Sequence, residues 1–128
     1  MRTALFLIAA AIAAGETPRD VVDLFQAVAG DLAQNNPSEF LDHFDRNMTG
    51  YATLRDEIES LLSASEVGSA IEIVTDEGDD QKRTLELDWV LEIADQQPRR
   101  AILKCTLEKQ GKKWKITALD PIEFFKSS

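Results

Sequence analysis

The chain has 128 residues and a formal net charge of −9, with 23 acidic against 14 basic residues. One domain of this size can bury a core without metal or disulfide support. The acidic balance argues against nucleic acid and anionic membrane as partners. The densest basic stretch surrounds a glycine and alternates with apolar residues, so we interpret it as the solvated end of a hairpin rather than an anion site; it consists of Lys109, Lys112, Lys113 and Lys115.

Residues 1–15 have the order of a secretory signal peptide. Arg2 precedes an uninterrupted apolar run at 4–14, and the small residues at 11–15 offer cleavage sites. The run is too short to span a bilayer, which takes about 20 residues; a buried first helix is the alternative interpretation. We expect export to the periplasm or the medium. The mature residues 16–128 then form a single domain that does not contact the membrane.

Three amphipathic helices are predicted between residues 17 and 63. Thr17 before Pro18 is typical of a cap and a first helical residue, and Asn36 before Pro37 repeats this pattern. A third helix is predicted after Gly50. Apolar residues recur at helical spacing: Val21, Phe25, Val28 and Leu32; then Phe40, Leu41 and Phe44; then Tyr51, Leu54, Ile58, Leu61 and Leu62.

From residue 66 onward the apolar period becomes two, which predicts β-strands joined by short turns. Helices that precede an antiparallel meander indicate an α+β fold, with the helices packed on a curved sheet of four or more strands. The side chains predicted to face the helices are Ile71 and Ile73; Leu85, Leu87, Trp89, Leu91 and Ile93; Ala101, Leu103, Cys105 and Leu107; and Trp114, Ile116 and Ala118.

Inward residues must lie opposite inward residues in a half-buried antiparallel sheet, and this requirement predicts the strand registers. A two-residue loop at 110–111 pairs Leu107 with Trp114. A five-residue loop at 95–99 pairs Leu91 with Leu103. Proline cannot donate to a β-ladder, so a bulge or bend is expected at Asp120-Pro121, after which apolar packing resumes.

The helices, the long strands and the closing stretch GKKWKITALDPIEFF at 111–125 resemble the nuclear-transport-factor-2-like (NTF2-like) superfamily. The superfamily includes ketosteroid isomerases and scytalone dehydratases, and the resemblance covers essentially all of the mature chain. It implies a cone-like arrangement, with a sheet wrapped around helices and a conical pocket between them. Many members are dimers. Its enzymes use an Asp base, a Tyr or protonated Asp, or a His-Asp pair in that pocket.

The predicted pocket wall offers no such group. The inward strand positions carry no carboxylate, histidine or tyrosine, so no catalytic residue of the superfamily can be assigned to the strands. The only histidine, His43, is close in sequence to Asp42 and Asp45, which could make it a poised base. Because His43 lies beside the predicted apolar stripe of its helix, a histidine at the rim or surface is the favoured interpretation.

No metal or cofactor motif is present. One histidine and one cysteine cannot build a zinc site on their own, and the sequence has no glycine-rich phosphate loop. Cys105 is the sole cysteine, so no internal disulfide can form. At an apolar strand position it is expected to be a buried, inert core residue.

The sequence therefore indicates two candidate functions. The first is an exported, non-catalytic binding or interaction module, whose cone either holds an apolar small molecule or is filled by side chains. The second is a small hydro-lyase or isomerase that uses His43 with Asp42 or Asp45. If the pocket is open, the candidates for its lining are Tyr51, Trp89, Leu103 and Trp114.

The other face of the sheet is expected to be charged, with apolar residues gathered at one end. The predicted registers place Val90, Ile102 and Leu119 together there, with Lys104 at the margin near Glu92. A two-fold interface would bury such a patch from both partners, so a homodimer through this face is predicted.

Overall fold

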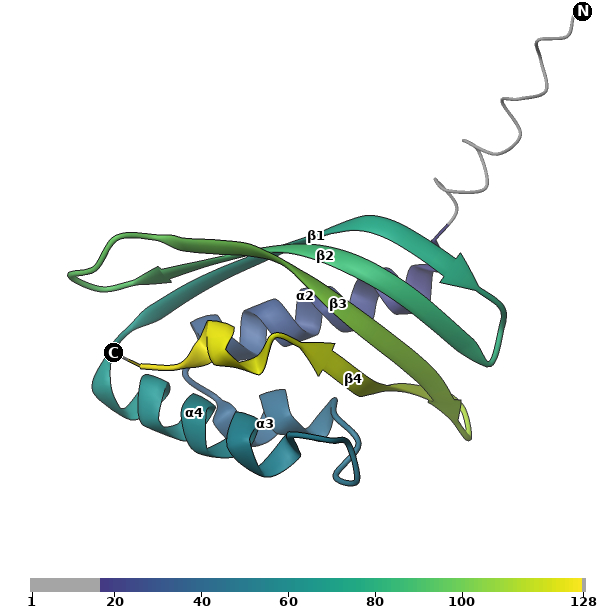
Figure 1. Cartoon of the computed structure of the whole chain (residues 1–128), viewed down its shortest axis with the longest axis horizontal. Coiled ribbons are helices and arrows are strands. Elements are labelled where there is room, and N and C mark those ends of the chain that lie inside the picture. Colours follow the sequence, from purple (N-terminus) through teal and green to yellow (C-terminus); the bar gives the residue numbers. More distant parts are fainter. Residues whose placement is uncertain (1–16, 128) are drawn as a thin grey trace, which may run out of the picture.

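The computed structural model describes residues 17–127, so the predicted signal peptide lies outside the described residues. Three helices precede a four-stranded antiparallel sheet in the order β1-β2-β3-β4 (Figure 1). The α+β prediction is confirmed. The elements are α2 (Arg19–Ala33), α3 (Pro37–Asp42), α4 (Tyr51–Ala64), β1 (Val67–Gly78), β2 (Lys82–Ile93), β3 (Arg99–Gln110), β4 (Lys113–Asp120) and the 3₁₀ helix η2 (Ile122–Phe125).

The curved, open sheet arches over the helices, which lie on one of its sides (Figure 1). α2 packs against β1, whereas α4 packs against η2 and α3. Segment 43–45 runs along the free edge of β4. There the amide of Asp45 donates to the carbonyl of Ile116 at 2.8 Å, and the amide of Ile116 donates to the carbonyl of His43 at 2.9 Å. The end of α3 is thereby tied to the sheet. No helix among residues 17–127 is long and apolar enough to cross a membrane.

The helix boundaries follow the local sequence, with one exception. Asn36 caps α3 as predicted, because its side chain accepts the Glu39 amide at 3.2 Å. The predicted cap of the first helix is wrong: Pro18 holds the N-cap position of α2, and no side chain caps it. Gly50 precedes α4 with a φ of +85°, a left-handed conformation that glycine adopts without the strain that a side chain would bring.

The core consists of the predicted helical stripes packed on the inward face of the sheet. The buried residues among those described are apolar, although the side chain of Asp76 in β1 is only 3% exposed and pairs with Arg83 at 2.8 Å. The closing segment joins this core, since Phe124 and Phe125 of η2 are both buried. The largest fully buried side chains are those of Trp89, Phe40, Phe44 and Phe125.

Both predicted hairpin registers are wrong, although the inward faces of the strands are largely right. Leu103 lies opposite Leu87 rather than Leu91. Leu107 lies opposite Ile116 rather than Trp114. The first error is a shift of four residues and the second a shift of two. Even shifts leave inward residues facing inward residues, so the parity test could not detect them.

A β-bulge in β4 changes which face its last residues occupy. The register shifts beside Leu107, so that Thr106 lies opposite Ala118 and Cys105 lies opposite Leu119. The extra residue reverses the alternation. Leu119 is therefore buried and Ala118 exposed, opposite to their predicted faces. A bulge or bend was expected at Asp120-Pro121, but the irregularity lies earlier in the strand. Strand β4 nevertheless ends at Asp120.

Candidate functional site

The space between the sheet and the short helices is filled by aromatic side chains. The centroid of the Trp89 ring of β2 lies 5.0 Å from the centroid of the Phe125 ring. The Phe125 centroid lies 6.2 Å from the centroid of the Phe40 ring. Phe40 in turn lies 5.0 Å from Phe44. The Trp89 indole N–H donates to the Ser69 hydroxyl at 2.9 Å. This chain of rings occupies the place where the resemblance implies a conical pocket.

Of the four residues predicted to line a pocket, two are wholly inside this core. Trp89 and Leu103 are fully buried and border neither of the two open clefts described below. Trp114 and Tyr51 border two different clefts. The four residues therefore do not meet in one site.

His43 pairs with a carboxylate that the sequence did not suggest. Its Nε2 lies 2.9 Å from Oδ2 of Asp31 on α2, and both side chains are partly buried, at 26% and 19% exposed. Asp42 and Asp45, the predicted partners, make other contacts. Asp31 directly precedes the buried Leu32 on α2, and a carboxylate beside an apolar stripe was the one signal that could have drawn attention to it.

The imidazole of His43 also borders a cleft of about 540 Å³ between α2, α3 and the β3–β4 hairpin. One wall carries Trp114 and the lysines at 112, 113 and 115; the other carries carboxylates. Trp114 is fixed by its N–H, which donates to Oδ2 of Asp20 at 3.1 Å, and by the Lys109 ammonium 4.8 Å from its ring. The basic hairpin end is thus partly engaged with α2 rather than wholly solvated.

Asp45 acts as a structural acceptor. Its Oδ1 accepts the Asn47 amide at 2.7 Å, and its Oδ2 accepts the Gln110 side-chain amide at 2.7 Å. The Asn47 amide, and after it the Gln110 amide, hold the pKa of this carboxyl below its usual range. A carboxylate held in its charged form by these donors is a poor proton acceptor. The exposed Asp42 contributes a backbone carbonyl, which accepts from the Lys115 ammonium.

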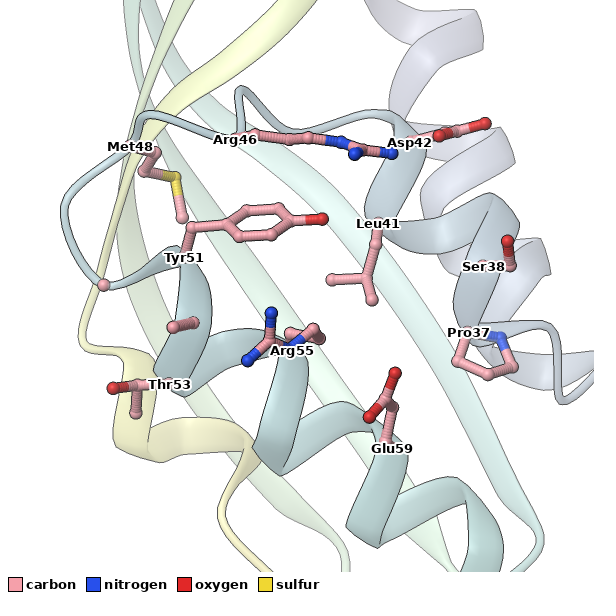
Figure 2. Close-up of a pocket in the computed structure, with 12 residues that line it drawn as sticks. Pro37, Ser38, Leu41, Asp42, Arg46, Met48, Tyr51, Thr53, Arg55 and Glu59 are labelled. Carbon is pink, nitrogen blue, oxygen red and sulfur yellow. The ribbon is translucent and has the colours of Figure 1, made fainter.

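The larger of the two clefts, of about 830 Å³, lies between α3 and α4 beneath the loop that joins them. Figure 2 shows the Tyr51 ring projecting into it between the side chains of Arg46 and Arg55, with the hydroxyl directed toward Leu41. The polar side chains around it include Ser38, Asp42, Thr53 and Glu59. Sequence reasoning singled out Tyr51 but neither arginine, because the two lie nine residues apart on a loop and a helix and only the fold brings them together.

On the outward face of the sheet, only two of the three residues of the predicted dimer patch are present. Val90 is half-buried and Ile102 is 50% exposed, whereas Leu119 lies in the core. Val74, at a bulge in β1, is 53% exposed. Beside Ile102, Arg100 forks onto Asp88 with bonds of 3.0 and 2.6 Å. This contact lowers the pKa of Asp88 and raises that of Arg100.

Neither cysteine nor metal chemistry is offered by the described residues. Cys105 is buried as predicted, and burial raises the pKa of its thiol, which keeps the thiol protonated and unreactive. Within residues 17–127, no three His, Cys, Asp or Glu side chains are grouped so as to hold a metal ion.

No family model and no curated protein sequence matches the chain. An NTF2-like protein of unknown function from Shewanella oneidensis is similar in structure at a TM-score of 0.66 and 13% identity, covering 78% of this chain and 93% of that one. Bd1075 from Bdellovibrio bacteriovorus gives a TM-score of 0.67 at 12% identity over 80% of this chain; the match spans only 40% of that protein's length.

A third similar structure is a protein from Novosphingobium aromaticivorans that is provisionally named a scytalone dehydratase. Its TM-score is 0.65 at 13% identity, covering 79% of each chain. At such identities the likeness concerns the fold and leaves function open. The resemblance noted in the sequence is confirmed at that level: the chain has the fold of the NTF2-like superfamily.

Proposed function

We propose that the chain is an exported, non-catalytic interaction module with a filled cone. The observation that carries this proposal is the buried aromatic chain from Trp89 to Phe44, which occupies the position where a substrate would enter a conical pocket. An enzyme of this architecture needs an acid or base that reaches a substrate inside the cone. Most inward strand positions here are apolar. The bulge in β1 does bring one carboxylate, Asp76, opposite the inward Leu85, contrary to the sequence prediction, but Asp76 is paired with Arg83 at 2.8 Å. The outer surfaces are therefore left for binding. The pattern of residues 1–15 supports export.

The partner we propose for the outward sheet face is a second copy of the chain. Around Ile102 the acidic side chains, Glu72, Glu86 and Asp88, come from β1 and β2. The basic ones, Arg100 and Lys104, come from β3. In a face-to-face dimer with its two-fold axis parallel to the strands, the acidic strands of one copy lie over the basic strand of the other. Val74 and Ile102 supply the exposed apolar area between them.

Sedimentation of the wild-type chain over a range of concentrations tests this dimer. Ile102→Asp should shift the equilibrium toward monomer, while Ala27→Asp, which adds the same charge on an exposed position of α2, should not. Lys104→Glu alone should weaken association, and adding Glu86→Lys should restore it, because the exchange conserves the charge pattern across the interface. A wild-type chain that stays monomeric at the highest concentration would rule the interface out.

A second candidate function has one specific observation in its favour. The His43–Asp31 pair resembles a base held by a carboxylate, and His43 borders an open cleft. Such a pair could abstract a proton beside a carbonyl group, which is the step a small hydro-lyase or isomerase requires. Against it, the cleft is lined mainly by charged side chains and lies outside the cone.

Exchange of deuterium into carbonyl compounds, followed by NMR, tests the second candidate. Were it correct, His43→Gln would slow exchange by about 100-fold or more, the usual contribution of a general base, and Asp31→Asn would slow it less. Asp95→Asn is the matched control, since Asp95 is an exposed aspartate that does not border this cleft. We expect no exchange above buffer for the wild-type chain and no effect of any of these substitutions.

A further inference from the structure

The cleft between α3 and α4 brings together two cationic side chains, of which one has no carboxylate partner among residues 17–127 and the other has only an exposed one. Within residues 17–127, no carboxylate lies within 4.0 Å of the Arg46 guanidinium. Arg55 makes one contact, of 3.3 Å, to its chain neighbour Asp56, and these side chains are 46% and 69% exposed. An exposed pair of this kind contributes little to stability. Both arginines are therefore free to turn toward a bound group, even though acidic residues outnumber basic ones in the chain.

Tyr51 stands between these two arginines. Figure 2 shows its ring flanked by Arg46 on one side and Arg55 on the other, with the hydroxyl directed toward Leu41. This hydroxyl has no hydrogen-bond partner among the described residues. Two guanidinium forks and a phenol O–H are all donors, so the group that satisfies them together is an acceptor, and a planar carboxylate matches the guanidinium geometry best.

The remaining lining limits the charge and the shape of the bound group. Asp42 and Glu59 also border the cleft, so a dianion such as phosphate would be repelled more strongly than a monoanion. Leu41, Met48 and the face of Tyr51 provide an apolar surface for a carbon skeleton. The volume of about 830 Å³ falls in the range of sites for small organic ligands.

We propose that this cleft binds a small organic monocarboxylate. Its carboxylate is held between Arg46 and Arg55 and accepts from the Tyr51 hydroxyl, while its apolar body rests against Leu41 and the tyrosine ring. The site is separate from the outward sheet face, which lies on the other side of the sheet from the helices (Figure 1). Ligand binding and dimerisation can therefore be tested independently.

Tyr51 is the only tyrosine of the chain, which gives the test a probe inside the cleft. The full chain labelled with ¹³C in the tyrosine ring is titrated with benzoate and observed by NMR. Benzamide, which has the same shape without the charge, and inorganic phosphate are titrated in parallel. A saturable shift of the Tyr51 signals with benzoate, and much weaker responses to the other two, is the expected result.

Substitutions then assign the contact. Arg46→Gln and Arg55→Gln should each weaken benzoate binding about tenfold or more, the usual effect of losing a hydrogen bond to a charged group. Arg19→Gln, an exposed arginine on α2, is the matched control and should leave binding unchanged. Circular dichroism confirms that each variant is folded; all three positions are exposed.

Three outcomes would overturn the proposal. The first is an unchanged Tyr51 signal at saturating benzoate. The second is an equal response to benzamide, which would indicate apolar contact without recognition of charge. The third is an equal response to phosphate, or an Arg19→Gln effect as large as those of the cleft arginines, which would indicate general attraction of anions.

Discussion

At the scale of single residues, Trp89 illustrates how side chains fill the space between the sheet and the helices. It is fully buried, its ring contacts Phe125 edge to face, and its one polar atom is satisfied by Ser69. An indole with its N–H paired can be buried without the penalty of an orphaned donor. A residue that could have lined a pocket is thus a central packing element.

We expect Trp89→Ala to lower the free energy of unfolding by about 3–5 kcal/mol, the usual cost of truncating a large buried aromatic residue. Urea unfolding measures this, and Ile102→Ala, at a half-exposed position, should stay within about 0.5 kcal/mol of wild type. If the urea midpoint and slope of Trp89→Ala matched those of the wild type, the space around Trp89 would not be tightly packed.

Asp45 allows a prediction about pH. Its folded-state pKa is depressed, so its contribution to stability is fully present above the unfolded value near 3.9 and is lost as pH falls through the lower folded value. A carboxyl titration followed by ¹³C NMR should give a midpoint below 3.8 for Asp45. Gln110→Ala should move the midpoint upward but not fully, since the Asn47 amide remains. A wild-type midpoint at or above 3.8 would contradict this.

The residue that the sequence could not identify is Asp31. Its side chain reaches His43 across 12 residues, because α2 and α3 are packed together. Proximity in sequence favoured Asp42 and Asp45, but the first is exposed and the second is held by Asn47 and Gln110. Which carboxylate meets a histidine depends on helix packing, and an apolar stripe predicts that helices pack but not which polar neighbours meet.

At the scale of elements, periodicity predicted three helices, four strands and their inward faces, but not their registers. Alternation has a period of two, so any even shift satisfies it equally well. The turn decides between the alternatives: Gln110 pairs with Lys113, which places the two-residue loop at Gly111 and Lys112, one position later than predicted. Gly111, with a φ of +66°, occupies the first loop position.

The bulge in β4 is the element-scale feature with the largest consequence. It turns Leu119 inward to 5% exposure and leaves Ala118 exposed. Leu119→Lys should therefore lower the free energy of unfolding by about 3 kcal/mol or more, through a buried charge and lost packing. Ala118→Lys should change it by about 0.5 kcal/mol or less. Urea midpoints in the reverse order would show that β4 runs without the bulge.

At the scale of the whole molecule, the fold places the core, a charged sheet face and a cleft with arginines in different regions. The helices and the inward sheet face supply the core, the outward sheet face carries acidic and basic side chains on different strands, and the α3–α4 cleft carries two exposed arginines, Arg46 and Arg55. The net charge argued against nucleic acid as a partner, but composition could not locate a local basic site within an acidic chain. The net charge is a sum over all residues, whereas the charge of a binding site depends on the few side chains that the fold brings together.

The last prediction concerns the boundary of the folded unit. Among the described residues the buried core begins at Val21, after the predicted cleavage site, and α2 begins at Arg19. A chain that lacks residues 1–15 should therefore keep every buried residue of the described core. Its urea midpoint should match that of the full chain within about 0.5 kcal/mol, as for changes outside the core.

A deletion that continues through Phe25 removes Val21 and Phe25, two of the residues that α2 buries, and it should abolish cooperative unfolding. In the native host, the exported protein should have the intact mass of a chain cleaved between residues 13 and 16. A full-length mass in the native host, together with a marked loss of stability on deleting residues 1–15, would instead identify that segment as part of the folded domain, the buried first helix that its apolar sequence also permits.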